Sequence, residues 1–205
     1  MRNRVKSKNR KTTRPDHYSE QEVMIILDCA RKESPLAYSI THFMYAAGLR
    51  LREICNLKVG EIDLGKEVVY VHDDCTLRSR VVPLLIPSVS RDYLESHSAR
   101  RGKADRFFVT ENMKAITKNT VRSLFKSVGK KAGIQISSHK LRRSVAIHLY
   151  DHGAQIERIR AILGCNQSRL IQWSLPLSVD QLRNCMNEYH PLAIAHRLGV
   201  NGQMK

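Results

Sequence analysis

The fold is decided by the stretch Ala47-Gly48-Leu49-Arg50-Leu51-Arg52-Glu53-Ile54-Cys55-Asn56-Leu57. A helical pattern precedes it over residues 36–47 and stops at Gly48, whose tolerance of positive φ suits the end of a helix. Because a second helical pattern follows, Arg50 is predicted at the junction of two helices. Its planar guanidinium presents paired donors to phosphate oxygens and keeps its charge at cellular pH. The alternative interpretation is a surface arginine that pairs with Glu53.

A small sheet is predicted downstream of this stretch. Residues 67–72 and 80–86 are β-branched runs separated by a polar segment, a pattern typical of a β-hairpin, and residues 107–109 are a candidate third strand. Ser19 and Glu22 form a capping box at the start of a first helix, and helical patterns fill most of the remaining chain. The residues therefore predict one domain, mainly α with a small antiparallel β-sheet.

A second informative stretch follows about ninety residues after the first: His139-Lys140-Leu141-Arg142-Arg143. On a helix, a spacing of three puts His139 and Arg142 on neighbouring positions of one face, so that one phosphate can meet both side chains. A histidine beside a cation can hydrogen-bond a phosphate oxygen or relay a proton near neutral pH. Arg50, His139 and Arg142 are therefore the predicted phosphate-binding residues.

Together the two stretches resemble the signature boxes of the tyrosine recombinase, or phage integrase, family. The resemblance covers nearly all of residues 18–193 and implies the family's catalytic-domain fold, in which two arginines hold the scissile phosphate. Arg50 and Arg142 match these arginines, and Glu53 matches an acidic residue commonly found on the next turn. The activity that the resemblance implies is site-specific DNA recombination, in which strands are cut and rejoined through a phosphotyrosine.

Two positions that the family uses for its chemistry carry other residues here. Counting back from the strand start Val82-Pro83-Leu84 puts the family's hairpin lysine, which protonates the leaving 5′ oxygen, at Cys75. The histidine or tryptophan usually found after the second box corresponds to Cys165, a weak donor. Arg78 and Arg80 lie nearby and are predicted DNA contacts, but an arginine with a pKa above about 12 is a poor proton donor.

The nucleophile position is also changed. The pair His190-Pro191, which resembles the family's tail, puts the family's tyrosine in register with Ser174. A serine hydroxyl is far less acidic than a tyrosine hydroxyl and needs an adjacent base, which is not evident there. The nearest downstream tyrosine, Tyr189, is the alternative nucleophile. Because the retained positions bind phosphate and the changed ones include the nucleophile and the general acid, the pattern predicts a degenerate site that holds DNA without cutting it.

The charge favours a polyanionic partner, double-stranded DNA above all. Lys plus Arg number 35 against 19 Asp plus Glu, which gives a net charge of +16. We predict a flexible basic arm at residues 1–17, the recombinase-like domain at 18–193 and a tail at 194–205. The predicted DNA contacts are Arg4, Lys6, Lys8, Arg10 and Lys11 in the arm and, beyond it, Arg78, Arg80, Arg100, Arg101, Lys103, Lys126, Lys130 and Lys131.

Other classes of protein are disfavoured. The five cysteines are odd in number and never form the C-x-x-C pairs of zinc and redox motifs, so we expect reduced thiols, no metal and no cofactor. No run approaches the roughly 18 apolar residues of a membrane span, and no apolar segment follows the basic N-terminus. We therefore expect an intracellular protein, cytoplasmic or associated with the nucleoid, without a membrane partner.

Three hypotheses about function follow. The first is a DNA-binding accessory or regulatory derivative of a recombinase, or a relic of a mobile element. The second is an active recombinase whose nucleophile is Tyr189, from its own or a neighbouring subunit. In the family the final helix, here about residues 179–189, is often donated to a neighbour, so a homo-oligomer on DNA is expected. The third is a basic RNA-binding or structural helical protein, which the aromatic content of 6% disfavours.

Overall fold

The computed structural model describes residues 15–73, 78–85, 91, 94–95, 98–99, 101–164 and 177–199. Helices dominate this part of the chain, and the three strands form one antiparallel sheet in the order β1-β2-β3, which confirms the predicted fold class. The elements are α1 (Glu20–Glu33), α2 (Pro35–Ala46), α3 (Leu51–Asn56), η1 (Val59–Glu61), β1 (Ile62–Asp63), β2 (Val68–Asp73), β3 (Arg78–Pro83), α5 (Lys118–Ala132), α6 (Ser138–Asp151), α7 (Ile156–Leu163), α8 (Val179–Tyr189) and α9 (Pro191–Arg197).

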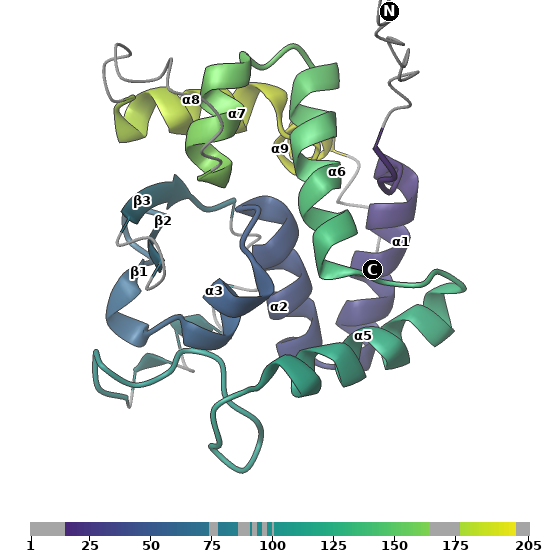
Figure 1. The fold of residues 1–205 in the computed structure, drawn as a ribbon, viewed down its shortest axis with the longest axis vertical. Helices are drawn as coiled ribbons and strands as arrows, with labels where there is room; N and C mark the ends of the chain where they lie inside the picture. The colour runs from purple at the N-terminus through teal and green to yellow at the C-terminus, as the bar shows by residue number, and fades with distance from the viewer. Residues whose placement is uncertain are drawn as a thin grey trace, which may run out of the picture.

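Helix α2 is the central element of the fold. Figure 1 shows the sheet on one side of α2 and helices α1 and α6 on the other, with α5 below and α7 and α8 above. Its side chains are buried over most of its length, because neighbours cover it on several sides.

The capping box predicted before α1 is present, with the Glu22 amide donating to Ser19 Oγ at 3.1 Å. The division of the chain predicted at residues 17 and 193 remains a prediction.

The predicted hairpin is confirmed, whereas the predicted third strand is wrong. Strands β2 and β3 pair with Val69 opposite Val82. The third strand is β1, which pairs with β2. Of residues 107–109, Phe107 and Phe108 pack on Phe43 with ring centroids 6.2 and 5.5 Å away. Val109 forms an isolated antiparallel bridge with Ala115 but no strand, so burial in the core explains the aromatic run.

Gly48 connects α2 to α3 in a conformation that only glycine adopts at low cost. Its φ is +58°, and a Cβ at this position would lie 2.3 Å from Leu163 Cδ2. The predicted helix-ending glycine is therefore confirmed. It also allows the end of α7 to approach the start of α3 closely, which brings the first sequence box against α7.

Gly48→Ala is expected to destabilise the protein by roughly 2–4 kcal/mol, because backbone strain adds to displacement of the Leu163 side chain. Gly133→Ala is the matched control, since Gly133 has a φ of +66° and a Cβ there would meet nothing within 4 Å. The control should lose only the strain contribution, about 1 kcal/mol. Urea denaturation measures both, and equal losses would contradict the close packing of α7 on Gly48.

Buried tyrosine and histidine side chains link α2 to α6 and to the start of α9. His148 Nε2 lies 2.8 Å from the Tyr18 carbonyl oxygen, so this nitrogen donates, and Nδ1 accepts from the Tyr45 hydroxyl at 2.7 Å. His190 Nε2 faces the Tyr45 carbonyl oxygen at 3.3 Å. Burial lowers the pKa of His190 to about 3 and that of His42 to about 4. The core is therefore built with neutral histidines.

Acidification from pH 7 to pH 5 is expected to destabilise the fold. Because the folded-state pKa values of His190 and His42 are depressed, the unfolded chain binds more protons below the ordinary pKa of 6.5. The stability present above that pKa is lost as the pH falls toward the folded-state values of about 4 and 3. At pH 5, protonation of the unfolded chain at each histidine lowers the stability by roughly 2 kcal/mol. Urea midpoints at both pH values measure the loss. Equal midpoints at the two pH values would contradict the neutral burial of His190 and His42.

Candidate phosphate-binding site

Three arginines from different elements converge on the C-terminal end of α7, and we call them the arginine cluster. Arg50 caps the start of α3 in an extended conformation, Arg80 lies on β3 and Arg142 is on α6. Figure 1 shows this end of α7 directed toward β3. Each arginine donates to one of three consecutive carbonyl oxygens: Arg80 Nε to Ile162 at 2.9 Å, Arg142 Nη2 to Leu163, and Arg50 Nη2 to Gly164 at 3.1 Å.

The Glu53 carboxylate lies between Arg50 and Arg80. It accepts from Arg80 Nη1 and Nη2 at 2.8 and 2.9 Å, and from Arg50 Nη1 and the Arg50 amide at 2.8 Å each. Burial alone would raise its pKa, but the hydrogen bonds and charge of Arg80, aided by Arg50, outweigh burial and lower the pKa to about 2. Glu53 is therefore ionised at neutral pH.

The charges in this site do not cancel. Among the described residues, the arginine cluster supplies three positive charges, and Glu53 and the C-terminal end of α7 supply one full and roughly half a negative charge. The side chains of Glu53 and Arg80 are only 5% and 12% exposed, whereas that of Arg50 is 39% exposed. Of these three side chains, Arg50 therefore offers the most surface to an approaching anion.

The structure brings two of the three predicted phosphate-binding residues into this cluster. Arg50 and Arg142 meet at the end of α7, and Arg142 Nη1 also donates to the Gly48 carbonyl oxygen. His139 is exposed on the first turn of α6, next to a groove that is also lined by Leu51. The first sequence box and the histidine of the second therefore border the same surface.

Arg80 has a different setting from the one expected of a DNA contact. Its guanidinium is nearly buried and is held by Glu53 and Ile162. This pairing was missed from the sequence, although a signal was present. Arg80 and Val82 are two residues apart on one strand, so their side chains point to the same face, and Val82 is fully buried. The contact of Arg80 with DNA remains a prediction.

Several other predicted site residues lie outside the described part of the chain. These are the three substituted family positions and six of the thirteen predicted basic contacts, and for Arg78 only the backbone is described. The residues outside are Cys75, Cys165, Ser174, Arg100, Arg4, Lys6, Lys8, Arg10 and Lys11.

Tyr189 lies away from the arginine cluster. It is the last residue of α8, and its ring approaches Gly153, in the turn that precedes α7. Hydrogen bonding to Glu188 raises the pKa of its hydroxyl. The arginines meet at the opposite end of α7, a helix that spans about 12 Å at 1.5 Å per residue. The structure therefore does not bring this alternative nucleophile to the predicted phosphate site.

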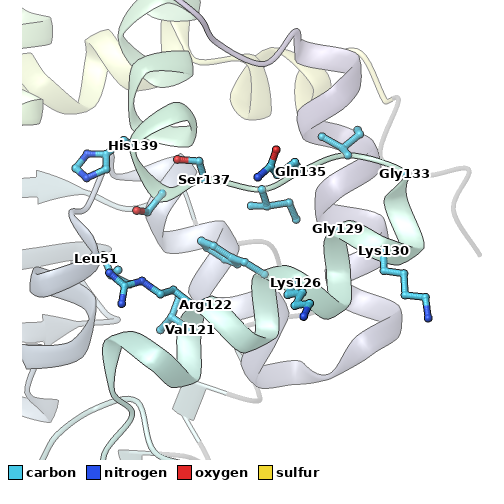
Figure 2. Close-up of a pocket in the computed structure, with 14 residues that line it drawn as sticks. Leu51, Val121, Arg122, Lys126, Gly129, Lys130, Gly133, Gln135, Ser137 and His139 are labelled. Atoms are coloured by element: carbon cyan, nitrogen blue, oxygen red, sulfur yellow. The ribbon is translucent and has the colours of Figure 1, made fainter.

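A groove of about 670 Å³ runs along α5 and is lined at one end by Leu51, the residue that follows Arg50. Arg122, Lys126 and Lys130 line it at helical spacings of four. Figure 2 shows His139 and Leu51 at one end of the groove and Lys130 at the other. Arg122 was missed from the sequence, although its spacing from Lys126 was the available signal. The groove thus continues the positive surface away from Arg50.

Two of the other predicted DNA contacts have partners within the protein. Lys131 Nζ lies 2.6 Å from a Glu33 carboxylate oxygen. Arg101 donates to the Phe107 carbonyl oxygen at 2.7 Å. Their charges are therefore less available to a ligand than those of Lys126 and Lys130, which are exposed.

No metal site is found among the described residues. His148 and His152 have the spacing of four that metal sites use on helices, but His148 is bonded to Tyr45 and His152 Nε2 lies 2.7 Å from Glu20 Oε1. In the same part of the chain, no helix is long and apolar enough to cross a membrane. Free thiols are present at Cys29, Cys55 and Cys185.

Comparison with known proteins gives one family. A model of the phage integrase family matches residues 17–173. Among curated relatives, tyrosine recombinase XerA of Thermococcus kodakarensis is 29% identical over 172 residues, which cover 82% of this chain and 59% of the relative. XerA of Pyrococcus horikoshii is 31% identical over 180 residues, covering 85% and 61%. The chain therefore spans about 60% of the length of these relatives.

Solved structures share the fold at lower sequence identity. The crystal structure of XerA recombinase has a TM-score of 0.64 at 22% identity and covers 94% of this chain and 67% of its own. XerH site-specific recombinase bound to its difH substrate has a TM-score of 0.61 at 18% identity, covering 93% and 53%. A lambda integrase dimer bound to a COC′ core site has a TM-score of 0.59 at 17% identity, covering 82% and 63%.

Proposed function

The chain belongs to the phage integrase family, the tyrosine recombinases, and we propose that it binds double-stranded DNA by holding a backbone phosphate between Arg50 and Arg142. The observation that carries this proposal is the convergence of both arginines on the end of α7 with an excess of positive charge. Guanidinium groups match phosphate oxygens in geometry and charge.

The α5 groove extends the proposed contact along the DNA. Arg122, Lys126 and Lys130 continue the positive surface from His139 (Figure 2), and the basic arm at residues 1–17 adds further cations. Contacts of this kind go to phosphates and carry little sequence information. Binding should therefore be tight at low salt, weak at high salt and only modestly selective among sequences.

The relatives give the biological setting of the proposal. They are named as tyrosine recombinases, and similar structures include XerH on its difH substrate and a lambda integrase dimer on a core site. We therefore propose that the protein acts in site-specific DNA recombination as a homo-oligomer, with the C-terminal helix α8 contributing to assembly. A single family match over both sequence boxes removes the reason to regard them as a coincidence in an RNA-binding protein.

Within recombination, we propose a non-cleaving accessory or regulatory role. Cys75 and Ser174 correspond to the family's proton donor and nucleophile, and neither supplies the chemistry of the residue it replaces. The alternative nucleophile Tyr189 gains no support from its location beside Gly153. Holding DNA while a complete partner recombinase cuts it is consistent with the retained arginines.

The unaltered protein is expected to form no covalent adduct with a nicked suicide substrate, a duplex that traps the protein–DNA intermediate after one cleavage. Denaturing gels of labelled substrate measure the adduct. Ser174→Tyr is the informative variant, because an adduct formed only by it would show that the nucleophile alone was missing. An adduct formed by the unaltered chain would contradict the non-cleaving role, and its loss in Tyr189→Phe would identify the nucleophile.

A further inference from the structure

Arg80 is the innermost residue of the arginine cluster and the one most completely occupied by protein partners. Its Nη1 and Nη2 atoms bind both oxygens of Glu53 at 2.8 and 2.9 Å, and its Nε donates to the Ile162 carbonyl oxygen at 2.9 Å. With 12% of the side chain exposed, it presents little surface to a ligand. Its role must therefore be sought in what it does to Glu53.

Glu53 is shared unequally between two cations. Arg80 forms a bidentate pair with the carboxylate, whereas Arg50 gives it one side-chain hydrogen bond, at 2.8 Å, and its backbone amide. Bidentate arginine–carboxylate pairs are the stronger arrangement. The negative charge of Glu53 is thus balanced mainly by Arg80, and both side chains are almost buried.

The consequence for Arg50 is electrostatic. Without Arg80, Glu53 would have Arg50 as its remaining described cationic partner, and a neutral Arg50–Glu53 pair attracts a phosphate poorly. With Arg80 present, Glu53 still orients the 39% exposed Arg50 through the amide and Nη1, but its single negative charge is shared between two arginines. Two arginines on one carboxylate carry one net positive charge among the three groups, and Arg50 is the most exposed of them.

The same residue also anchors the end of α7. Arg80 holds the Ile162 carbonyl oxygen, and Arg50 holds that of Gly164, so Arg50 is fixed between α7 and Glu53. A Cβ at Gly164 would lie 3.0 Å from Arg80 Cδ and Nη1, which shows how closely the backbone packs on the guanidinium. The position of Arg50 therefore depends on Arg80 through two separate contacts.

We propose that Arg80 is a positioning residue for the phosphate site: it neutralises and fixes Glu53, so that Glu53 aims Arg50 while the charge of Arg50 remains available to DNA. This inference rests on the proposed binding of DNA phosphate by Arg50. It differs from the prediction that Arg80 itself contacts DNA. It also differs from a purely structural role, because it concerns the charge that Arg50 presents.

The test is the salt dependence of duplex DNA binding by the full chain, since the slope of log K against log salt changes by about 0.9 for each phosphate contact. Arg80→Met should lower the magnitude of the slope by about one, because Glu53 then pairs with Arg50 and cancels its charge. Adding Glu53→Gln to Arg80→Met should restore the unaltered slope, because no carboxylate remains to cancel Arg50. Arg91→Met, which removes an arginine bound to Glu67, is the matched control and should leave the slope unchanged.

The outcomes separate the possible roles of Arg80. A slope that stays low in the double variant would show that Arg80 contacts DNA directly, and a slope unchanged in Arg80→Met would show a purely structural role; either overturns the inference. If Arg80→Met does not fold, Arg80→Lys is compared with the double variant, and both should keep the unaltered slope. Should Arg50→Gln also leave the slope unchanged, the proposed phosphate contact of Arg50 would fail instead.

Discussion

Arg142→Gln is expected to lower the affinity for duplex DNA by about ten- to a hundred-fold at fixed low salt. Arg142 is the second of the two proposed phosphate-binding arginines. Its loss removes charge-assisted hydrogen bonds worth roughly 1.5–3 kcal/mol, where about 1.4 kcal/mol corresponds to a factor of ten. Arg142→Lys should lose less, because it keeps the charge but not the paired donors. Fluorescence anisotropy with a labelled duplex measures the change.

The matched control is Arg31→Gln, which removes an arginine paired with Asp28 on α1. Its affinity for DNA should remain within about two-fold of the unaltered protein, since Arg31 is not one of the proposed phosphate contacts and an exposed charge is screened by salt. Arg142 also donates to the Gly48 and Leu163 carbonyl oxygens, so thermal unfolding must accompany the measurement. A folded Arg142→Gln variant with unchanged affinity would contradict the proposed phosphate contact.

Arg80→Met is expected to destabilise the fold by about 3–5 kcal/mol, the largest stability change anticipated for a single substitution here. Removing one partner of a buried ion pair is strongly destabilising, because Glu53, which is 5% exposed, would lose its bidentate partner and keep the more exposed Arg50 as its described cationic partner. The low pKa of Glu53, about 2 in the intact cluster, should rise at the same time. Urea denaturation at pH 7 measures the loss.

The double variant Arg80→Met/Glu53→Gln distinguishes this cause from poor packing. Once the carboxylate is replaced by an amide, no buried charge has lost its bidentate partner, and much of the lost stability should return. Equal stabilities of Arg80→Met and the double variant would mean that side-chain packing, and not charge, dominates at Arg80. The Arg91→Met control concerns a more exposed pair and should lose no more than about 1 kcal/mol.

The local features of the fold could be predicted because each depends on neighbouring residues. The helix end at Gly48, the capping box at Ser19 and the hairpin of β2 and β3 follow from backbone preference and periodicity. Arg50 and Arg142 were identified by their setting in two sequence boxes. Their convergence is a long-range contact, which the resemblance to a family implied and periodicity alone did not.

The features that were missed depend on contacts between distant segments. Arg80 pairs with Glu53 because β3 lies beside α3 and α7, and a single sequence gives no direct sign of that arrangement beyond strand parity. Phenylalanine is a residue type that favours strands, but Phe107 packs in the core beside Phe43. Tertiary packing therefore overrides local preference at both positions.

The salt dependence of duplex DNA binding, compared between the unaltered chain and Arg50→Gln/Arg142→Gln, tests the central claim most directly. Each lost phosphate contact changes the slope of log K against log salt by about 0.9, so the double variant should have a slope smaller in magnitude by roughly two. Its far-ultraviolet circular dichroism must match that of the unaltered chain. A folded double variant with the same slope and affinity would show that Arg50 and Arg142 do not hold DNA phosphate.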